Sequence, residues 1–163
     1  MHNKIIHLNN LRKIVSKKQS EGKKIVLCHG VFDLLHFGHI THFKNAKKNG
    51  NILIVSITPD KFVKKGPGRP VFNQNIRALS LAELNIVDYV TINNSHSAVN
   101  VIRTIKPNIF CKGAEYKIHN SEYKIHNCHL WGQDLNNSLQ GAGGVGGLLK
   151  TSSFNFQLSA YDS

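Results

Sequence analysis

Two histidines, His36 and His39, stand close together in the stretch Gly30-Val31-Phe32-Asp33-Leu34-Leu35-His36-Phe37-Gly38-His39. If they lie in the first turn of a helix, their side chains point in the same direction. Two imidazoles can then donate hydrogen bonds to one group, while Gly38, and similarly Gly30, leaves room for a ligand near the backbone. This arrangement suits a reaction in which negative charge builds up on phosphate oxygens.

Metal binding is the alternative chemistry for these histidines. A protein metal site requires about three or four ligands, and His29 and His42 lie near the pair in the sequence. Neither of them gives a spacing that is familiar from zinc sites. The pair alone therefore leaves three interpretations open, which are phosphate chemistry, metal binding and two surface histidines without a function.

The segments on either side of the pair indicate how it is held. The apolar run Ile25-Val26-Leu27-Cys28 predicts a buried parallel strand, and the helical spacing of Ile40, Phe43 and Ala46 predicts a helix that ends near Lys48. The histidines thus belong to a strand-to-helix turn. A helix start offers free N–H groups and the positive end of the helix dipole, which together favour phosphate.

Strands and helices alternate along the rest of the chain. We predict strands over residues 24–29, 52–57, 87–92 and 109–111, and helices over residues 8–20, 73–84 and 96–105. The inward faces of the last two helices are expected to carry Ile76, Leu79, Leu81 and Leu84, and Val99, Ile102 and Ile105. This alternation predicts an α/β fold, a Rossmann-like doubly wound parallel sheet.

A basic loop follows the predicted strand 52–57. Residues 64–70 read Lys-Lys-Gly-Pro-Gly-Arg-Pro, which combines three cations with a backbone that forms neither helix nor central strand. Ligands of open α/β sheets bind beyond the carboxyl ends of the strands, where this loop begins. A mobile loop there could bind an acceptor phosphate and exclude water. The alternative is an ordinary exposed loop.

The pattern Gly30-x-Phe32-Asp33-x-x-His36-x-Gly38-His39 resembles the signature of the cytidylyltransferase-like nucleotidyltransferases. Within that family, the chain is most similar to the sugar-phosphate adenylyltransferases of the D-glycero-β-D-manno-heptose 1-phosphate adenylyltransferase type. The segments Lys65–Pro70, Val87–Val90 and Lys106-Pro107, followed by Lys112-Gly113, support the similarity. It extends from about Gly22 to Lys117.

The resemblance implies a role for each candidate residue. His36 and His39 would stabilise the charge on the α-phosphate of a nucleoside triphosphate, as the catalytic pair. The nucleotide would be bordered by Gly30, Val31, Phe32, Asp33, Gly38, Lys112 and Gly113. The acceptor phosphate would be bound by Lys64, Lys65, Arg69 and Arg77. Two alternatives stay open, because Asp33 could orient the turn and Arg77 could form a structural ion pair.

The implied reaction is the transfer of AMP from ATP to a sugar 1-phosphate of the heptose-phosphate type, with release of pyrophosphate. Mg²⁺ is expected as the companion of the triphosphate, and the sequence shows no dedicated carboxylate metal site. A CTP-dependent cytidylyltransferase that acts on glycerol phosphate or a similar alcohol phosphate is the alternative enzyme. A degenerate, non-catalytic nucleotide-binding module is the alternative without catalysis.

Composition and charge limit the other functions. The chain has 163 residues, enough for one α/β domain, and its net charge of +12 suggests polyanionic ligands. We expect these to be a triphosphate and a sugar phosphate and not nucleic acid, since basic and aromatic residues are not interleaved. No apolar run reaches about 18 residues and no leader is visible, so we expect a cytoplasmic protein without a membrane partner. The sequence is compatible with a homodimer.

Three cysteines, Cys28, Cys111 and Cys128, show no CxxC spacing. An odd number in this pattern favours reduced thiols over disulfides or zinc ligands. Since Cys28 and Cys111 lie in predicted strands, we expect them to act as small core side chains.

The character of the chain changes after residue 117. Residues 1–117 carry 19 Lys and Arg against 6 Asp and Glu, whereas residues 118–163 carry 2 against 3. Residues 115–121 and 122–128 form a tandem repeat that differs only in its last position, and a glycine-rich run follows at 141–147. We therefore expect a nucleotidyltransferase domain over residues 1–117, with the helix 8–20 leading in. Residues 118–163 are interpreted as an atypical, disordered tail that a frameshift or another alteration produced.

Overall fold

The sheet is the centre of the computed structural model, which describes residues 4–95 and 97–112 and the backbone of residues 125–127. Five strands pair in the order β3-β2-β1-β4-β5, and all four pairings are parallel. They are β1 (Ile25–Gly30), β2 (Ile52–Ile57), β3 (Tyr89–Ile92), β4 (Ile109–Lys112) and β5 (Ile125–Asn127). The predicted α/β class and Rossmann-like parallel sheet are thereby confirmed.

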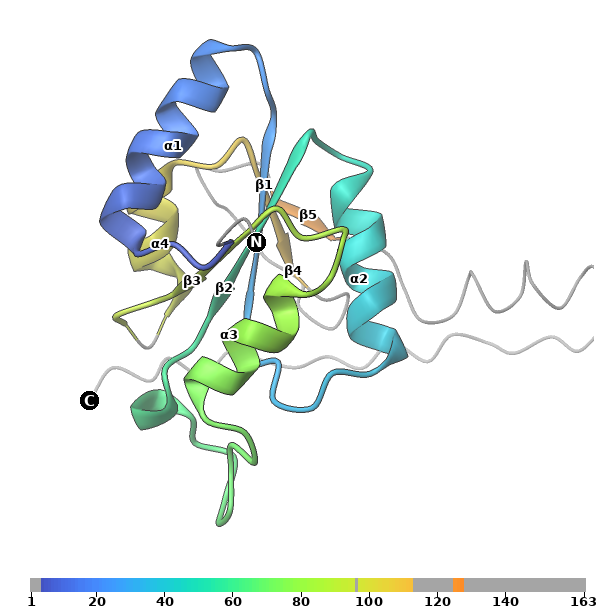
Figure 1. Cartoon of the computed structure of the whole chain (residues 1–163), viewed down its shortest axis with the longest axis vertical. Coiled ribbons are helices and arrows are strands. Elements are labelled where there is room, and N and C mark those ends of the chain that lie inside the picture. The colour runs from blue at the N-terminus through green and yellow to red at the C-terminus, as the bar shows by residue number, and fades with distance from the viewer. Residues whose placement is uncertain (1–3, 96, 113–124, 128–163) are drawn as a thin grey trace, which may run out of the picture.

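Helices cover both faces of the sheet (Figure 1). They are α1 (Leu8–Ser20), α2 (Phe37–Lys47), the short 3-10 helix η1 (Asp60–Phe62), α3 (Gln74–Ala82) and α4 (Ala98–Ile105). Helices α1 and α4 pack on one face, and α2 and α3 on the other. The result is a three-layer arrangement in which the carboxyl ends of the strands share one edge.

The central strands β1 and β2 are mainly apolar, as expected for strands whose two faces are both covered by helices. In β1, Val26 and Cys28 pack toward α2 and α3, while Ile25 and Leu27 pack toward α1 and α4. All four side chains are fully buried. This core holds β1 rigidly, so the turn that follows its carboxyl end starts from a fixed position.

Two helices present a different face from the one that their apolar spacing predicts. In α3, Ile76 and Leu79 are 43% and 56% exposed, whereas Arg77 is buried. The prediction for Ile76 and Leu79 was therefore wrong, because polar bonds of Arg77 in the interior orient this helix. In α4, Val99 is 47% exposed and Val101 takes the buried place that was expected for it.

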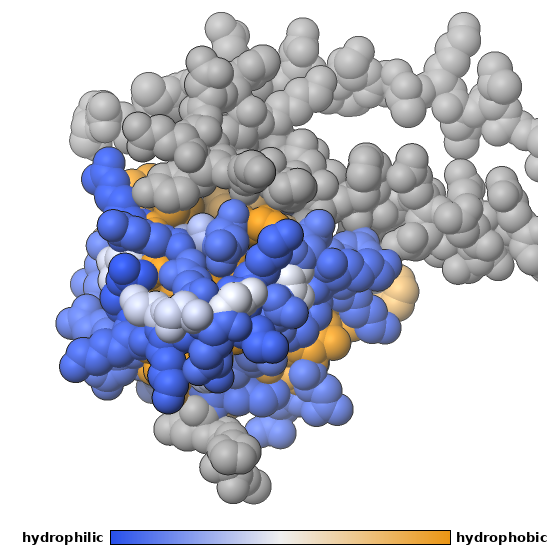
Figure 2. Space-filling model, turned by 90° about the horizontal axis from the view of Figure 1, so that it is seen from above, coloured by the Kyte–Doolittle hydropathy of each residue, from blue (hydrophilic) through white to orange (hydrophobic). Residues whose placement is uncertain are grey.

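The amino-end edge of the sheet carries no part of the candidate site. Figure 2 looks onto this edge from above and shows a mainly hydrophilic surface. Exposed lysines of its turns include Lys23, Lys24 and Lys48. The basic loop and the histidine turn lie at the opposite edge, at the bottom of Figure 1.

The remaining predictions have different outcomes. Helix α1 and strand β2 have the predicted bounds, and Cys28 and Cys111 are buried free thiols as expected. Strand β5 was not predicted, since three residues are too short to show a period. Cys128 and nearly all of the tail lie outside the described residues. No helix in the described part of the chain has the length and apolar character that a membrane crossing requires.

Candidate active site

His36 forms the N-cap of α2, where its backbone is extended (φ −140°, ψ 172°). Its Nδ1 accepts a hydrogen bond from the backbone N–H of Gly38 at 3.1 Å. In the neutral ring the proton is therefore on Nε2, and the residue as a whole is exposed. The same bond occupies the Gly38 N–H, which is therefore not available to a ligand. A ligand at the start of α2 would contact the His36 imidazole first.

His39 lies directly beside His36. The centroids of the two rings are 3.9 Å apart and their planes differ by 33°. Burial, together with the positive charges of His36, His42 and Lys65, lowers the pKa of His39 to about 4, although a backbone hydrogen bond of Leu34 opposes the shift. The Nδ1 of His39 is buried and lacks a hydrogen-bond partner. The ring is thus neutral at pH 7, and an anion beside it would favour its protonation.

Phe32 positions His39 from the other side. Its ring meets the His39 ring edge-on, with centroids 5.3 Å apart, and the Phe43 ring at 5.1 Å. The backbone of Phe32 is left-handed, with a φ of 49°. A Cβ on Gly30 would come within 2.9 Å of the Phe32 Cζ, so the space beside Gly30 is occupied by this ring. Gly30 therefore allows an aromatic contact, where we expected it to leave room for a ligand.

Asp33 joins the histidine turn to the basic loop. Its carboxylate accepts hydrogen bonds from Arg69 Nη1 at 2.9 Å and from the backbone N–H groups of Val71 and Phe72 at 2.9 and 3.0 Å. Desolvation of the carboxylate acts to raise its pKa, but the two backbone donors and Arg69 outweigh it and lower the pKa to about 2. These contacts support the alternative in which Asp33 orients the turn. Its expected place beside the nucleotide stays a prediction.

The basic loop brings its cations to the same edge as the histidines. Lys64 and Lys65 are exposed, and the charge of Lys65 is close enough to lower the pKa of His39. The Arg69 side chain is 42% exposed while it pairs with Asp33. The structure thus brings together three of the four residues that were predicted to bind the acceptor phosphate.

Arg77, the fourth, does not fit that role. Its side chain has no exposed surface. Its guanidinium donates hydrogen bonds to the backbone carbonyls of Val31, Thr58 and Phe72 and to the Asp60 carboxylate, the last at 2.6 Å. The structure therefore corrects the predicted phosphate role, because the donors of Arg77 already have partners in the interior. It supports the ion-pair alternative.

Lys112 is the last residue of β4, which pairs with β1 in the register Cys28↔Cys111. The strand order reverses between β1 and β4, so the crevice of an open α/β sheet is expected there. Lys112 and the histidine turn flank this switch point. The expected partner of Lys112, Gly113, lies outside the described residues.

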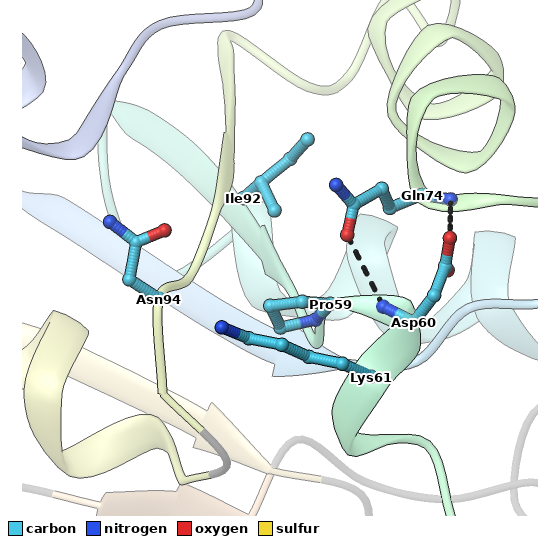
Figure 3. A pocket seen from close by; sticks show the side chains of 6 residues that line it. All are labelled: Pro59, Asp60, Lys61, Gln74, Ile92 and Asn94. Atoms are coloured by element: carbon cyan, nitrogen blue, oxygen red, sulfur yellow. Dashed lines mark hydrogen bonds between the residues drawn. The ribbon is translucent and has the colours of Figure 1, made fainter.

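A pocket of about 390 Å³ opens at the carboxyl ends of β2 and β3 (Figure 3). Its lining residues are Pro59, Asp60, Lys61, Gln74, Ile92 and Asn94. None of them was singled out as a site residue from the sequence. The available signal was that Pro59, Asp60, Lys61 and Asn94 follow predicted strands, which no short motif marks.

Metal chemistry finds no support in the described side chains. Residues 4–95 and 97–112 contain no group of three His, Cys, Asp or Glu side chains that could hold a metal ion. His29, one of the two nearby histidines, instead contacts Ser56 Oγ at 3.2 Å and Thr58 Oγ1 at 3.3 Å.

Comparison with known proteins agrees with this geometry. Residues 27–156 match the family model described as Cytidylyltransferase-like. A protein of Campylobacter fetus named "Bifunctional protein HldE" is 44% identical over 115 residues, which are 69% of this chain and 24% of that protein. A protein of the same name from Aliarcobacter butzleri is 40% identical over 109 residues, 66% of this chain and 23% of its own. This chain thus spans about a quarter of the length of these curated relatives.

A solved structure extends the comparison to the fold. It is the crystal structure of a lipopolysaccharide core biosynthesis protein from Thermoplasma volcanium GSS1. The two chains align with a TM-score of 0.58 and 30% sequence identity. The alignment covers 64% of this chain and 94% of that chain.

Proposed function

Because this chain belongs to the cytidylyltransferase-like family of nucleotidyltransferases, we propose that it transfers AMP from ATP to a sugar 1-phosphate of the heptose-phosphate type and releases pyrophosphate. The observation that carries the proposal is the stacked pair His36 and His39 at the start of α2. It lies at the carboxyl edge of the sheet, next to the switch point. ATP and the sugar phosphate rest on the resemblance of the sequence to sugar-phosphate adenylyltransferases.

The reaction is a substitution at the α-phosphorus of ATP. An oxygen of the acceptor phosphate forms the new P–O bond, the bond between the α-phosphorus and its bridge oxygen to the β-phosphate breaks, and pyrophosphate leaves with that oxygen. Negative charge increases on the outer oxygens during this step. The Nε2–H of His36 and the ring of His39 stabilise that charge, together with the positive end of the α2 dipole.

The remaining residues orient the two substrates. Lys64, Lys65 and Arg69 bind the acceptor phosphate, and Asp33 holds the Arg69 guanidinium in place before the acceptor arrives. Val31, Phe32, Asp33, Gly38 and Lys112 border the nucleotide. Mg²⁺ arrives as part of the triphosphate substrate, where it neutralises phosphate charge.

The test is pyrophosphate release from the full chain, with ATP or CTP offered beside sugar 1-phosphates and glycerol phosphate. We expect release that requires ATP and a sugar 1-phosphate. His36→Ala should lower the rate by about 10²–10³-fold, which is typical for the loss of one such donor. His36→Asn is the matched control, because asparagine can still cap α2 but lacks the imidazole donor. We expect slow pyrophosphate release from both variants, although only the alanine variant loses the side-chain cap of α2.

Three results would contradict the proposal. Release with CTP and glycerol phosphate alone would establish the alternative cytidylyltransferase. A folded protein that binds nucleotide but releases nothing with any acceptor would establish a non-catalytic module. Full activity of both His36 variants would exclude His36 from the reaction.

A further inference from the structure

The pocket at the ends of β2 and β3 has no part in the reaction described so far. It shares the carboxyl edge of the sheet with the histidine turn, since parallel strands end together and Ile57 pairs with Ile92. Arg77 connects the two regions directly, because it donates hydrogen bonds to Asp60 in the pocket wall and to Val31 in the turn. Asp60 and Lys61 precede the basic loop of residues 64–70 and Gln74 follows it, so the pocket lies where both ends of that loop join the fold.

We propose that this pocket binds the sugar of the acceptor through its hydroxyl groups, an inference that rests on the proposed function. The lining combines polar side chains, Asp60, Lys61, Gln74 and Asn94, with the apolar surfaces of Pro59 and Ile92. Pockets that bind small molecules combine apolar walls with a few placed polar groups in this way. A sugar ring needs both, because its hydroxyls form hydrogen bonds while its C–H faces pack on apolar carbon.

One wall of the pocket is held in a fixed conformation. The Asp60 N–H donates to Gln74 Oε1 at 3.2 Å, and the Gln74 N–H donates to Asp60 Oδ2 at 3.0 Å. Asp60 Oδ1 accepts from Arg77. These bonds neutralise the carboxylate and orient the Gln74 amide before any ligand binds, so the wall requires little reorganisation on binding.

The opposite wall supplies groups that can meet hydroxyls. Figure 3 shows the Lys61 ammonium and the Asn94 amide on the same side of the cavity, across from the Asp60 and Gln74 pair. An ammonium donates hydrogen bonds, and an amide both donates and accepts. This mixture matches a neutral group with several hydroxyls, each of which also donates and accepts. The acceptor phosphate then remains with Lys64, Lys65 and Arg69.

The experiment measures KM for ATP and for the sugar 1-phosphate separately, in the full chain and in the variants Lys61→Met and Asn94→Ala. Each variant should raise the acceptor KM by about three- to tenfold, the worth of one or two hydrogen bonds, and leave the ATP KM within about twofold. Lys13→Met and Asn10→Ala on α1 are matched controls, because they remove the same groups from exposed positions on the far face. Neither control should change either KM.

A deoxy acceptor identifies the recognised group. If Asn94 binds a particular hydroxyl, a sugar phosphate without that hydroxyl should lose affinity in the wild-type protein and no further affinity in Asn94→Ala. Direct titration of the sugar 1-phosphate into the protein without nucleotide gives the same comparison independently of turnover. If each deoxy analogue loses as much affinity in Asn94→Ala as it loses in the wild-type protein, the effects are additive and the inference is overturned.

The remaining outcomes separate this inference from the proposed function. Acceptor-dependent activity with an unchanged acceptor KM in both variants would overturn the pocket assignment and leave the reaction intact. An increase in the ATP KM instead would assign the pocket to the nucleotide. If Lys61→Met weakens inhibition by inorganic phosphate as much as it weakens binding of the sugar phosphate, the pocket is a phosphate site and the inference is overturned. If the wild-type protein uses no sugar phosphate at all, the proposed function fails and the inference fails with it.

Discussion

Replacement of Arg77 by methionine tests how the candidate site is held together. Methionine has similar length and fills irregular space well, so the substitution removes the charge and the donors with little loss of packing. It leaves the Asp60 carboxylate without its cation and the carbonyls of Val31, Thr58 and Phe72 without this donor. Removal of one partner from a buried ion pair costs about 3–5 kcal/mol.

The structure places the expected loss at the lower end of that range. The Asp60 side chain is 35% exposed, so water can partly replace the guanidinium there. The Thr58 carbonyl lies in a buried contact and would lose its donor without compensation. We therefore expect the free energy of unfolding to fall by about 3 kcal/mol, which is a large part of the roughly 5–15 kcal/mol that stabilises a typical domain.

Urea unfolding, followed by circular dichroism at pH 7, measures this loss. Arg77→Lys should be intermediate, because lysine keeps the charge but cannot reach four acceptors with a planar fork. Asp60→Asn and the double variant complete a cycle, in which the coupling energy of Arg77 and Asp60 should exceed about 0.5 kcal/mol. If the unfolding free energy of Arg77→Met falls by less than about 1 kcal/mol, with an unchanged m-value, the four hydrogen-bond partners of Arg77 do not hold the surrounding loops in place.

Three further predictions concern the histidine turn. Gly30→Ala places a Cβ 2.9 Å from Phe32 Cζ and should displace His39 with it, so that kcat falls by up to about 10²-fold; an unchanged kcat would exclude this coupling. In an NMR titration of the free protein, His39 should titrate with a pKa of about 4, and ATP should raise this value; a pKa at or above the ordinary 6.5 would contradict the burial of the ring. Asp33→Asn should be less stable than the wild type at pH 7. The pKa of Asp33 is lowered from 3.8 to about 2, so the stability that its carboxylate contributes is complete above about pH 4 and is lost as the pH falls toward 2. The difference in unfolding free energy between the wild type and Asp33→Asn should therefore shrink over that interval. A difference that stays constant would refute the lowered pKa of Asp33.

Much of the frame was predictable from the sequence because its physical causes are local. The run Ile52–Ile57, apolar except for Ser56, is buried on both faces, and its strand has the predicted bounds. Leu8, Leu11 and Val15 recur at helical spacing along α1, and they form the buried face of this helix. The histidine turn was predictable because a strand, a short connection and a helix start follow one another directly.

The parts that were missed depend on contacts between segments far apart in the chain. Arg77 is buried because acceptors at Val31 and Thr58, from distant segments, and at the nearby Phe72 converge on it, and no local sequence pattern predicts such a set. Its burial in turn leaves Ile76 and Leu79 on the outside of α3. The left-handed backbone of Phe32 is equally hidden, since this residue type rarely adopts it.

These contacts connect the histidine turn to the basic loop. Phe72 is held from both sides, since its N–H donates to Asp33 and its carbonyl accepts from Arg77. Arg77 also holds the carbonyl of Val31, the residue before Phe32, and the Phe32 ring contacts His39. We therefore expect a movement of the basic loop to reach His39 through Asp33 and Arg77. In this protein, the affinity for the acceptor and the geometry of the catalytic pair should change together.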